Sequence, residues 1–383
     1  MPQHYPIIIP EINNKHSICD YLIQTALITS QKSYPTYIFY SSDPPKFTNR
    51  IIQVSPNLFN FSPIKIIPFN RFKISQNINI YLSFNLLYLY IFLHHSTRPF
   101  YWIFYPQVAN LIKFSFRPRF LIHDIIDFFT SPNSKISSKL SSQKKYFLQK
   151  SNLVTSISTS FKKNYLKIFS STKIHLVPQG FKLLPPSKNI HPQIKKLKKL
   201  TNKVAFIGVI NNRLDFDLLF KLIKSTPKIN YLFIGPVSFD INVSPKPITK
   251  LSQKLFSFKN VVHIDLIPKD QIAQFIEIID IAIIPYDISD DFNRLCCPMK
   301  LFEYFAGAKP VISTPIEELK LFPNLVFTSN DPLIWQQLLN KLLSKPWPLS
   351  IQKQQKLLAK NNSWENKVKK VLKLISQFLL QST

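Results

Sequence analysis

Residues 297–307 read Cys297-Pro298-Met299-Lys300-Leu301-Phe302-Glu303-Tyr304-Phe305-Ala306-Gly307, and this stretch decides the fold. Pro298 suits the first turn of a helix, where its missing N–H costs nothing. Lys300 lies in the same turn, and Glu303 lies three residues later on the same face. With a nucleoside diphosphate across the helix, the lysine would meet the diphosphate and the carboxylate would accept hydrogen bonds from the ribose hydroxyls. An ordinary surface ion pair between these two side chains is the alternative.

Around this stretch, short apolar runs alternate with longer helical segments along the whole chain. This alternation predicts an α/β fold with parallel sheets covered by helices. A break rich in proline and lysine at residues 183–202 predicts a linker between a domain of residues 1–182 and a domain of residues 203–362. Predicted strands are residues 5–10, 36–40, 64–68, 100–105, 120–124, 153–157, 173–177, 204–207, 231–234, 261–263, 279–284, 310–313 and 325–327. Predicted helices are residues 17–30, 77–94, 137–150, 160–169, 215–224, 269–277, 298–306, 332–343 and 363–380.

Composition restricts the class of protein. The 383 residues suffice for two domains of ordinary size. Three cysteines, two of them adjacent, give neither a disulfide framework nor the spacing of metal ligands, which indicates a reducing compartment. No secretory signal pattern is visible at the N-terminus, so we expect a cytoplasmic protein. The apolar run of residues 78–93 is too short to span a bilayer and predicts a buried or membrane-surface helix.

The formal net charge of +29 favours anionic partners. A strongly basic protein surface attracts anionic lipid or phosphate-bearing ligands. A nucleic-acid-binding protein would show basic and aromatic residues interleaved in a recognised module, and none is present. We therefore expect no nucleic-acid partner.

A second candidate loop reads Phe206-Ile207-Gly208-Val209-Ile210-Asn211-Asn212-Arg213. It combines a strand, one of only four glycines, and an arginine before the next helix. Ligands of parallel sheets bind beyond the carboxyl ends of the strands. There, Arg213 could grip a diphosphate while the helix N-terminus supplies N–H donors, and Gly208 would allow a positive φ or a close approach. A solvated arginine at a helix start is the alternative.

The third candidate loop, in the first half, contains His123, Asp124 and Asp127 after a predicted strand. An aspartate there could act as the general base that deprotonates an acceptor hydroxyl. It could equally stabilise a developing oxocarbenium ion or orient the acceptor. Alternatively, both aspartates only cap the next helix.

Residues 298–314 closely resemble the donor-binding helix and strand of GT-B glycosyltransferases of the group 1 (family 4-like) type, with the pattern P-x-K-x-x-E-Y-x-A-x-G-K-P-V-V-x-T. The resemblance extends over most of the chain from Trp102 onward. It implies two Rossmann-like domains facing across a cleft, with a last helix, residues 363–383, that crosses back onto the first domain. It also implies that the reaction needs no metal or cofactor, and it favours retention at the sugar. The implied residues for binding the nucleotide-sugar donor are Arg213, Lys300, Glu303, Gly208 and Pro298.

The chain departs from the family pattern in three places. Many members carry two glutamates eight positions apart; Glu303 fits the second, but Leu295 stands at the first. Asp290, Asp291 or a backbone amide would have to replace that carboxylate. The usual glycine before Lys-Pro is Ala308, and the glycine-rich acceptor loop of the N-terminal domain is absent.

These features together predict a glycosyltransferase that moves a sugar from a nucleotide diphosphate-sugar to an acceptor hydroxyl. We expect Asp127, Asp124 and His123 to be its candidate catalytic residues. The acceptor would be a glycan or a lipid-linked glycan of the cell envelope, met at the anionic inner face of a membrane. A non-catalytic nucleotide-sugar-binding homologue and a nucleotide-sugar epimerase of the same fold are the alternatives.

Overall fold

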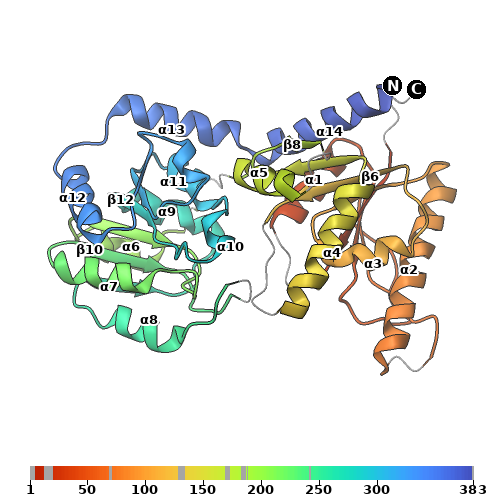
Figure 1. The fold of residues 1–383 in the computed structure, drawn as a ribbon, viewed down its shortest axis with the longest axis horizontal. Coiled ribbons are helices and arrows are strands. Elements are labelled where there is room, and N and C mark those ends of the chain that lie inside the picture. Colours follow the sequence, from red (N-terminus) through yellow and green to blue (C-terminus); the bar gives the residue numbers. More distant parts are fainter. Residues whose placement is uncertain are drawn as a thin grey trace.

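The computed structural model describes residues 5–12, 20–68, 71–127, 134–168, 173–182, 187, 189–240 and 243–381. These residues form two separate sheets, each covered by helices, that lie side by side (Figure 1). The two-sheet α/β architecture agrees with the sequence prediction. In the described part of the chain, no helix is long and apolar enough to cross a membrane.

The first sheet has eight strands in the order β3-β4-β2-β1-β5-β6-β7-β8. Neighbouring strands run parallel, except that β3 and β4 form an antiparallel hairpin at one edge. The central strands are buried on both faces, which explains why they are nearly continuous apolar runs. The strands are β1 (Ile7–Glu11), β2 (Thr36–Tyr40), β3 (Ile52–Ser55), β4 (Leu58–Phe61), β5 (Phe100–Ile103), β6 (Phe120–Ile125), β7 (Leu153–Ser156) and β8 (Ile174–Leu176). The helices are α1 (Asp20–Gln31), α2 (Lys73–His95), α3 (Ala109–Lys113), α4 (Ser134–Lys150) and α5 (Thr159–Ile168).

The second sheet has six strands, all parallel, in the order β11-β10-β9-β12-β13-β14. Crossing helices connect parallel strands, so the carboxyl ends of the strands all meet at one edge. The strands are β9 (Lys203–Ile207), β10 (Asn230–Ile234), β11 (Val261–Ile264), β12 (Ile281–Ile284), β13 (Val311–Ser313) and β14 (Val326–Thr328). The helices are α6 (Pro192–Leu197), α7 (Phe216–Ser225), α8 (Ile248–Phe256), α9 (Ile272–Ile278), α10 (Asp291–Arg294), α11 (Lys300–Ala306) and α12 (Pro332–Leu343).

The last two helices, α13 (Leu349–Asn361) and α14 (Trp364–Gln381), lead the chain back from the second sheet to the first (Figure 1). Ser363, between them, pairs with Phe181, so the two crossings between the domains lie side by side. A Cβ on Gly180 would lie 2.5 Å from the Trp364 ring, so this junction needs glycine for its close packing.

Helix α14 docks on the first domain through an apolar stripe and one charge. Val368, Val371 and Ile375 are buried in the core of the first domain. Lys367 Nζ lies 3.1 Å from Asp124 Oδ2, and both side chains are almost completely buried. The crossing helix that the family resemblance implies is therefore present and firmly attached.

Residues 64–68, predicted as a strand, form none, and β4 takes the place beside β2 instead. Asn79 Oδ1 accepts hydrogen bonds from the backbone N–H groups of Ile66 and Ile67, each at 2.8 Å. Ser83 Oγ accepts from the N–H of Ile64, also at 2.8 Å. Because side chains of α2 satisfy these donors, the segment needs no neighbouring strand, and the prediction was wrong for that reason.

The segment predicted as a linker is partly helical. Its helix α6 buries Ile194 and Leu197 in the core of the second domain. Residues 183–186 and 188 of this segment lie outside the described residues, as do residues 17–19 and 169 at the ends of two predicted helices. The β3–β4 hairpin and helices α8 and α13 were not predicted, although α8 is clearly amphipathic and buries Ser252 and Leu255 on one face.

Candidate functional site

Lys300, the first residue of α11, lies over the carboxyl end of β9. Its Nζ is 3.8 Å from the centroid of the Phe206 ring and 5.2 Å from that of Tyr286. Gly208, just after β9, has a φ of +142°, and a Cβ on it would lie 2.6 Å from Lys300 Nζ. Any side chain at position 208 would therefore displace the ammonium group. Among the described residues no carboxylate pairs with Lys300, so its charge is available to a ligand.

Arg213 also lies over Tyr286. Its guanidinium carbon is 4.4 Å from the centroid of the Tyr286 ring and 4.7 Å from that of Phe292. Its Nε donates a hydrogen bond to Asn293 Oδ1 at 2.7 Å, which holds the planar group in one orientation. Lys300 and Arg213, distant in the sequence, thus share one aromatic ring at the carboxyl edge of the second sheet.

The start of α7, predicted to offer N–H donors beside Arg213, is already occupied. Asp215 caps this helix, and its Oδ1 accepts a hydrogen bond from the N–H of Leu218 at 2.9 Å. A carboxylate at a helix N-terminus repels a second anion. This cap engages one of the N–H groups on which the prediction relied, and Arg213 and Lys300 are the cationic groups placed at this edge of the sheet.

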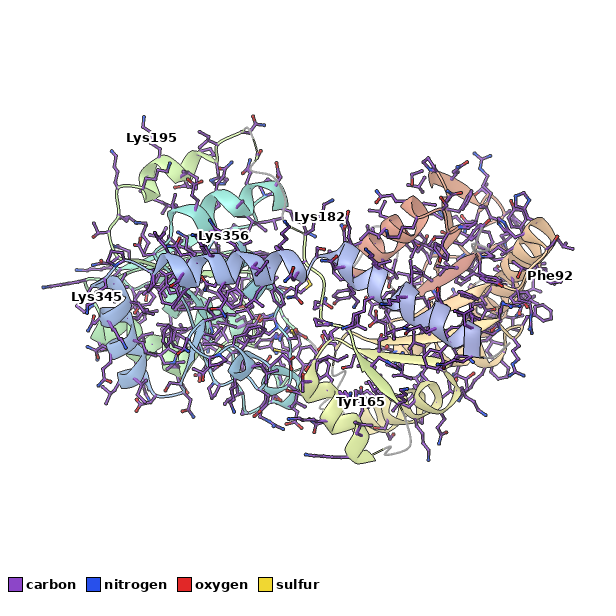
Figure 2. All side chains as sticks on the ribbon, turned by 90° about the horizontal axis from the view of Figure 1, so that it is seen from above. Phe92, Tyr165, Lys182, Lys195, Lys345 and Lys356 are labelled. Atoms are coloured by element: carbon purple, nitrogen blue, oxygen red, sulfur yellow. The ribbon has the colours of Figure 1, made fainter. Side chains whose placement is uncertain are left out.

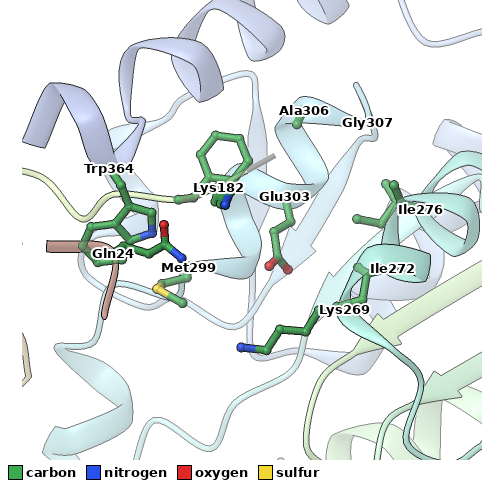
Figure 3. A pocket seen from close by; sticks show the side chains of 12 residues that line it. Gln24, Lys182, Lys269, Ile272, Ile276, Met299, Glu303, Ala306, Gly307 and Trp364 are labelled. Atoms are coloured by element: carbon green, nitrogen blue, oxygen red, sulfur yellow. The ribbon is translucent and has the colours of Figure 1, made fainter. Parts of the chain in front are cut away.

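Glu303 lies one turn further along α11, at an interdomain cavity of about 330 Å³. In the close-up of Figure 3, Glu303 and Lys269 project into this space from the second domain. Gln24 of α1 and Trp364 of α14 line it from the other side. A volume of this order is that of a small-molecule site.

Pro298 lies directly before α11. Its carbonyl accepts a hydrogen bond from the N–H of Leu301 at 3.1 Å, which starts the helix.

Leu295, at the position of the missing first glutamate, is 1% exposed and belongs to the core of the first domain. The loop before α11, which carries Leu295, thus makes an apolar contact with the first domain. Asp290, one candidate replacement, accepts hydrogen bonds from Ser244, and Asp291 forms a 2.6 Å ion pair with Arg294. Both carboxylates are therefore held by neighbours within the second domain.

The turn after α11 also uses its residues differently from the family pattern. Ala308 has a φ of +54°, the left-handed conformation that glycine usually supplies. A Cβ on Gly307 would lie 2.2 Å from Ile276 Cγ2 of α9, so this glycine is required for helix packing. The turn is thus made at Ala308, while Gly307 lets two helices approach.

The three candidate residues of the first-domain loop lie in different surroundings. Asp124 is fully buried in the ion pair with Lys367, and Thr155 Oγ1 also donates to it at 2.9 Å. His123 is buried too, stacks on Phe147 with ring centroids 5.0 Å apart, and has its pKa lowered to about 4 by that burial. Both environments favour structural roles, because neither side chain reaches the cleft.

Asp127 is partly exposed, and its carboxylate acts electrostatically on groups of both domains. Burial lowers the pKa of Lys144, on α4, to about 8, and the nearby Asp127 carboxylate opposes that shift. In the other domain, the pKa of Arg213 is raised above its ordinary value: burial acts to lower it, but Tyr286, Cys296 and Asp127 outweigh that effect. The structure therefore brings Asp127 near the predicted diphosphate-binding arginine, and it separates Asp124 and His123 from that place.

Glu318 is an interdomain residue that sequence reasoning missed. Its carboxylate, from the second domain, accepts hydrogen bonds from Ser158 Oγ at 2.9 Å and from the Thr159 N–H at 3.2 Å, at the start of α5. The Ser-Thr-Ser run at 158–160 is a visible capping signal. No pattern in the sequence, however, indicates that this run pairs with a glutamate 160 residues further along the chain.

In the described part of the chain, no group of three or more His, Cys, Asp or Glu side chains could hold a metal ion.

No protein-family model matches the sequence. A putative teichuronic acid biosynthesis glycosyltransferase of Bacillus subtilis (strain 168), TuaH, is 27% identical over 206 residues. The match covers 51% of this chain, and the chain spans about half the length of that relative, 50%.

Solved structures match over nearly the whole chain. Sucrose-phosphate synthase from Thermosynechococcus elongatus superimposes with a TM-score of 0.74 over 99% of this chain and 100% of that one, at 14% identity. Alr3699/HepE of Anabaena, solved in complex with UDP and glucose, gives 0.70 over 97% and 100%, at 13% identity. This chain has the GT-B fold. In this GT-B protein, Lys300 and Arg213 lie on the second domain, while Asp127 lies on the first.

Proposed function

We propose that the chain is a glycosyltransferase that uses a nucleotide diphosphate-sugar as its donor. The observation that carries this proposal is the pair of cations, Lys300 and Arg213, over the single ring of Tyr286. They are placed beyond the carboxyl edge of a parallel sheet, where α/β folds bind nucleotides. The TuaH match and the UDP-containing HepE neighbour support a donor of this class.

In the proposed reaction, the bond between the anomeric carbon of the sugar and the diphosphate oxygen breaks. A bond from that carbon to the acceptor oxygen forms, and the acceptor hydroxyl loses its proton. Lys300 and Arg213 would neutralise the departing nucleoside diphosphate, which is where negative charge develops. Glu303 would accept hydrogen bonds from the ribose hydroxyls. Gly208 and Pro298 would act indirectly, by leaving room for the ammonium group and by starting α11. No cofactor or metal is needed for these steps.

Asp127 is the residue that we propose to act at the reacting sugar or at the acceptor hydroxyl. It is partly exposed, and its carboxylate is near Arg213 across the domain boundary. Asp124 and His123 are then supporting residues: Asp124 holds α14 in place, and neutral His123 packs against Phe147 of α4. The acceptor that we propose is a glycan or a lipid-linked glycan of the cell envelope, used on the cytoplasmic side.

Glu303→Ala is expected to lower kcat/KM for the donor roughly 10- to 100-fold, because hydrogen bonds to a charged group are lost. The measurement is nucleotide release from UDP-, GDP-, ADP- and dTDP-sugars, which also identifies the base. Glu277→Ala, which removes an exposed carboxylate from α9 of the same domain, is the control and should match wild type. Equal activity of Glu303→Ala and wild type would place the donor site elsewhere.

Asp127→Asn is expected to lower kcat about 100- to 10,000-fold if the carboxylate moves a proton or stabilises the reacting sugar. The KM for the donor should change little, because the groups that bind the nucleotide stay in place. Asp217→Asn, which alters an exposed carboxylate on α7, is the matched control. A rise in KM with unchanged kcat would instead make Asp127 a residue that only positions a substrate.

One observation favours a second candidate function. Leu295 is buried where many family members have a carboxylate, so the chain could bind a nucleotide-sugar without transferring the sugar. The nucleotide-release screen separates the two functions. A non-catalytic homologue would bind a nucleotide-sugar, detected by calorimetry, and release no nucleotide from any donor.

A further inference from the structure

Helix α2 is apolar on both sides, although only one side is covered by protein. Its inner side buries Phe84, Leu87 and Ile91 against the first sheet. A surface helix normally turns polar residues to water on its other side. Here the outer side carries exposed aliphatic residues at intervals of three and four: Ile74, Ile78, Leu82, Leu86, Leu89 and Leu93.

A neighbouring loop enlarges this apolar surface. Phe114 and Phe116, just after α3, are 68% and 46% exposed. The loop is fixed to α2 by Asn85, whose Nδ2 donates to the Phe114 carbonyl at 3.1 Å and whose Oδ1 accepts from the Phe116 N–H at 2.8 Å. We call the six aliphatic residues together with Phe114 and Phe116 the α2 face. An apolar surface built from two elements that hold each other in place indicates an interaction site.

The stretch of chain that carries the α2 face contains no acidic residue. The sequence has no Asp or Glu between Asp43 and Asp124. Exposed cations lie next to the face in the chain: Arg71, Lys73, Arg98, Lys113 and Arg117. A protein partner of mixed charge would tolerate carboxylates near the face. An anionic lipid surface attracts the cations near it and repels carboxylates, so it fits a stretch without acidic residues better.

We propose that the α2 face lies on an anionic lipid bilayer, with its aliphatic residues among the acyl chains and its cations at the headgroups. Helix α2, which carries most of the face, lies on the outer side of the first domain, away from the second domain (Figure 1; Phe92 of this helix is labelled in Figure 2). Binding there leaves the second domain and the interdomain cavity clear of the membrane. The surface proposal does not depend on the chain transferring sugar.

The test is co-sedimentation of the full chain with vesicles of phosphatidylcholine alone and of phosphatidylcholine with 30% phosphatidylglycerol, in about 150 mM salt. We expect wild type to bind the anionic vesicles at least tenfold more tightly than the neutral ones. Leu86→Gln/Leu89→Gln/Leu93→Gln should weaken that binding about 100-fold, since three insertions are lost on a helix that glutamine tolerates.

The matched control is Leu321→Gln/Leu333→Gln/Leu349→Gln, which changes three exposed leucines of the other domain and should bind like wild type. Unchanged thermal unfolding and nucleotide release would show that the α2 variant is folded, so failure of vesicle binding is distinct from failure of the proposed reaction. No binding of wild type to anionic vesicles, or equal binding of both triple variants, would overturn the proposal. So would a vesicle-free dimer that the α2 variant alone dissociates, because the face would then join two copies of the chain.

Discussion

Lys300→Met is expected to lower kcat of glycosyl transfer about 100- to 1,000-fold, the usual effect of removing one group that stabilises charge in a transition state. The methionine keeps an unbranched stem over Phe206 and Gly208 and removes only the ammonium group. The leaving diphosphate would then have Arg213 alone to neutralise it. Because the lost charge acts where negative charge develops, kcat should fall more than donor affinity does.

The measurement is steady-state nucleotide release, together with inhibition by the free nucleoside diphosphate to report ground-state binding. Lys250→Met, which removes an exposed ammonium group from α8, is the control for the loss of one positive charge. If Lys300→Met stays within threefold of wild type in both assays, the diphosphate binds elsewhere. If only binding suffers, Lys300 serves the ground state and not the departure of the leaving group.

Lys367→Met is expected to destabilise the first domain by about 3–5 kcal/mol, because it leaves the Asp124 carboxylate buried without its cation. The two side chains are 1% and 0% exposed, so water cannot compensate for the loss. The measurement is the midpoint of urea unfolding followed by tryptophan fluorescence, to which Trp102 and Trp364 of this core contribute. Lys370→Met changes an exposed lysine of the same helix and should leave the midpoint unchanged.

The double variant Lys367→Met/Asp124→Asn tests the cause. It removes both charges and keeps an oxygen that can accept from Thr155, so most of the lost stability should return. A double variant as unstable as Lys367→Met would show that packing of the lysine stem, and not the unpaired charge, is responsible. A single variant within 1 kcal/mol of wild type would contradict the ion-pair argument altogether.

Local spacing was enough to predict two placements. Lys300 and Glu303 are three residues apart on one helix, and Gly208 directly follows a strand, so each placement depends on the backbone of a single element. The same reasoning failed at residues 64–68, whose backbone N–H groups bond to side chains of α2. There the partner of a backbone donor decides the structure, and composition does not name that partner.

Periodicity and short motifs act within one element, so the sequence by itself determined the alternation of strands and helices and the pair of residues on α11, while the crossing of the last helix was implied by the family resemblance. Only the tertiary structure separated Asp124 from Asp127, three positions apart in the chain. Docking of α14 buries the first against Lys367, whereas the second stays at the domain boundary near Arg213. Only the fold, too, placed Lys300 and Arg213 over one ring and brought Glu318 to the start of α5. Each of these contacts joins residues far apart in the chain, so burial and charge at them are set by packing and not by sequence spacing.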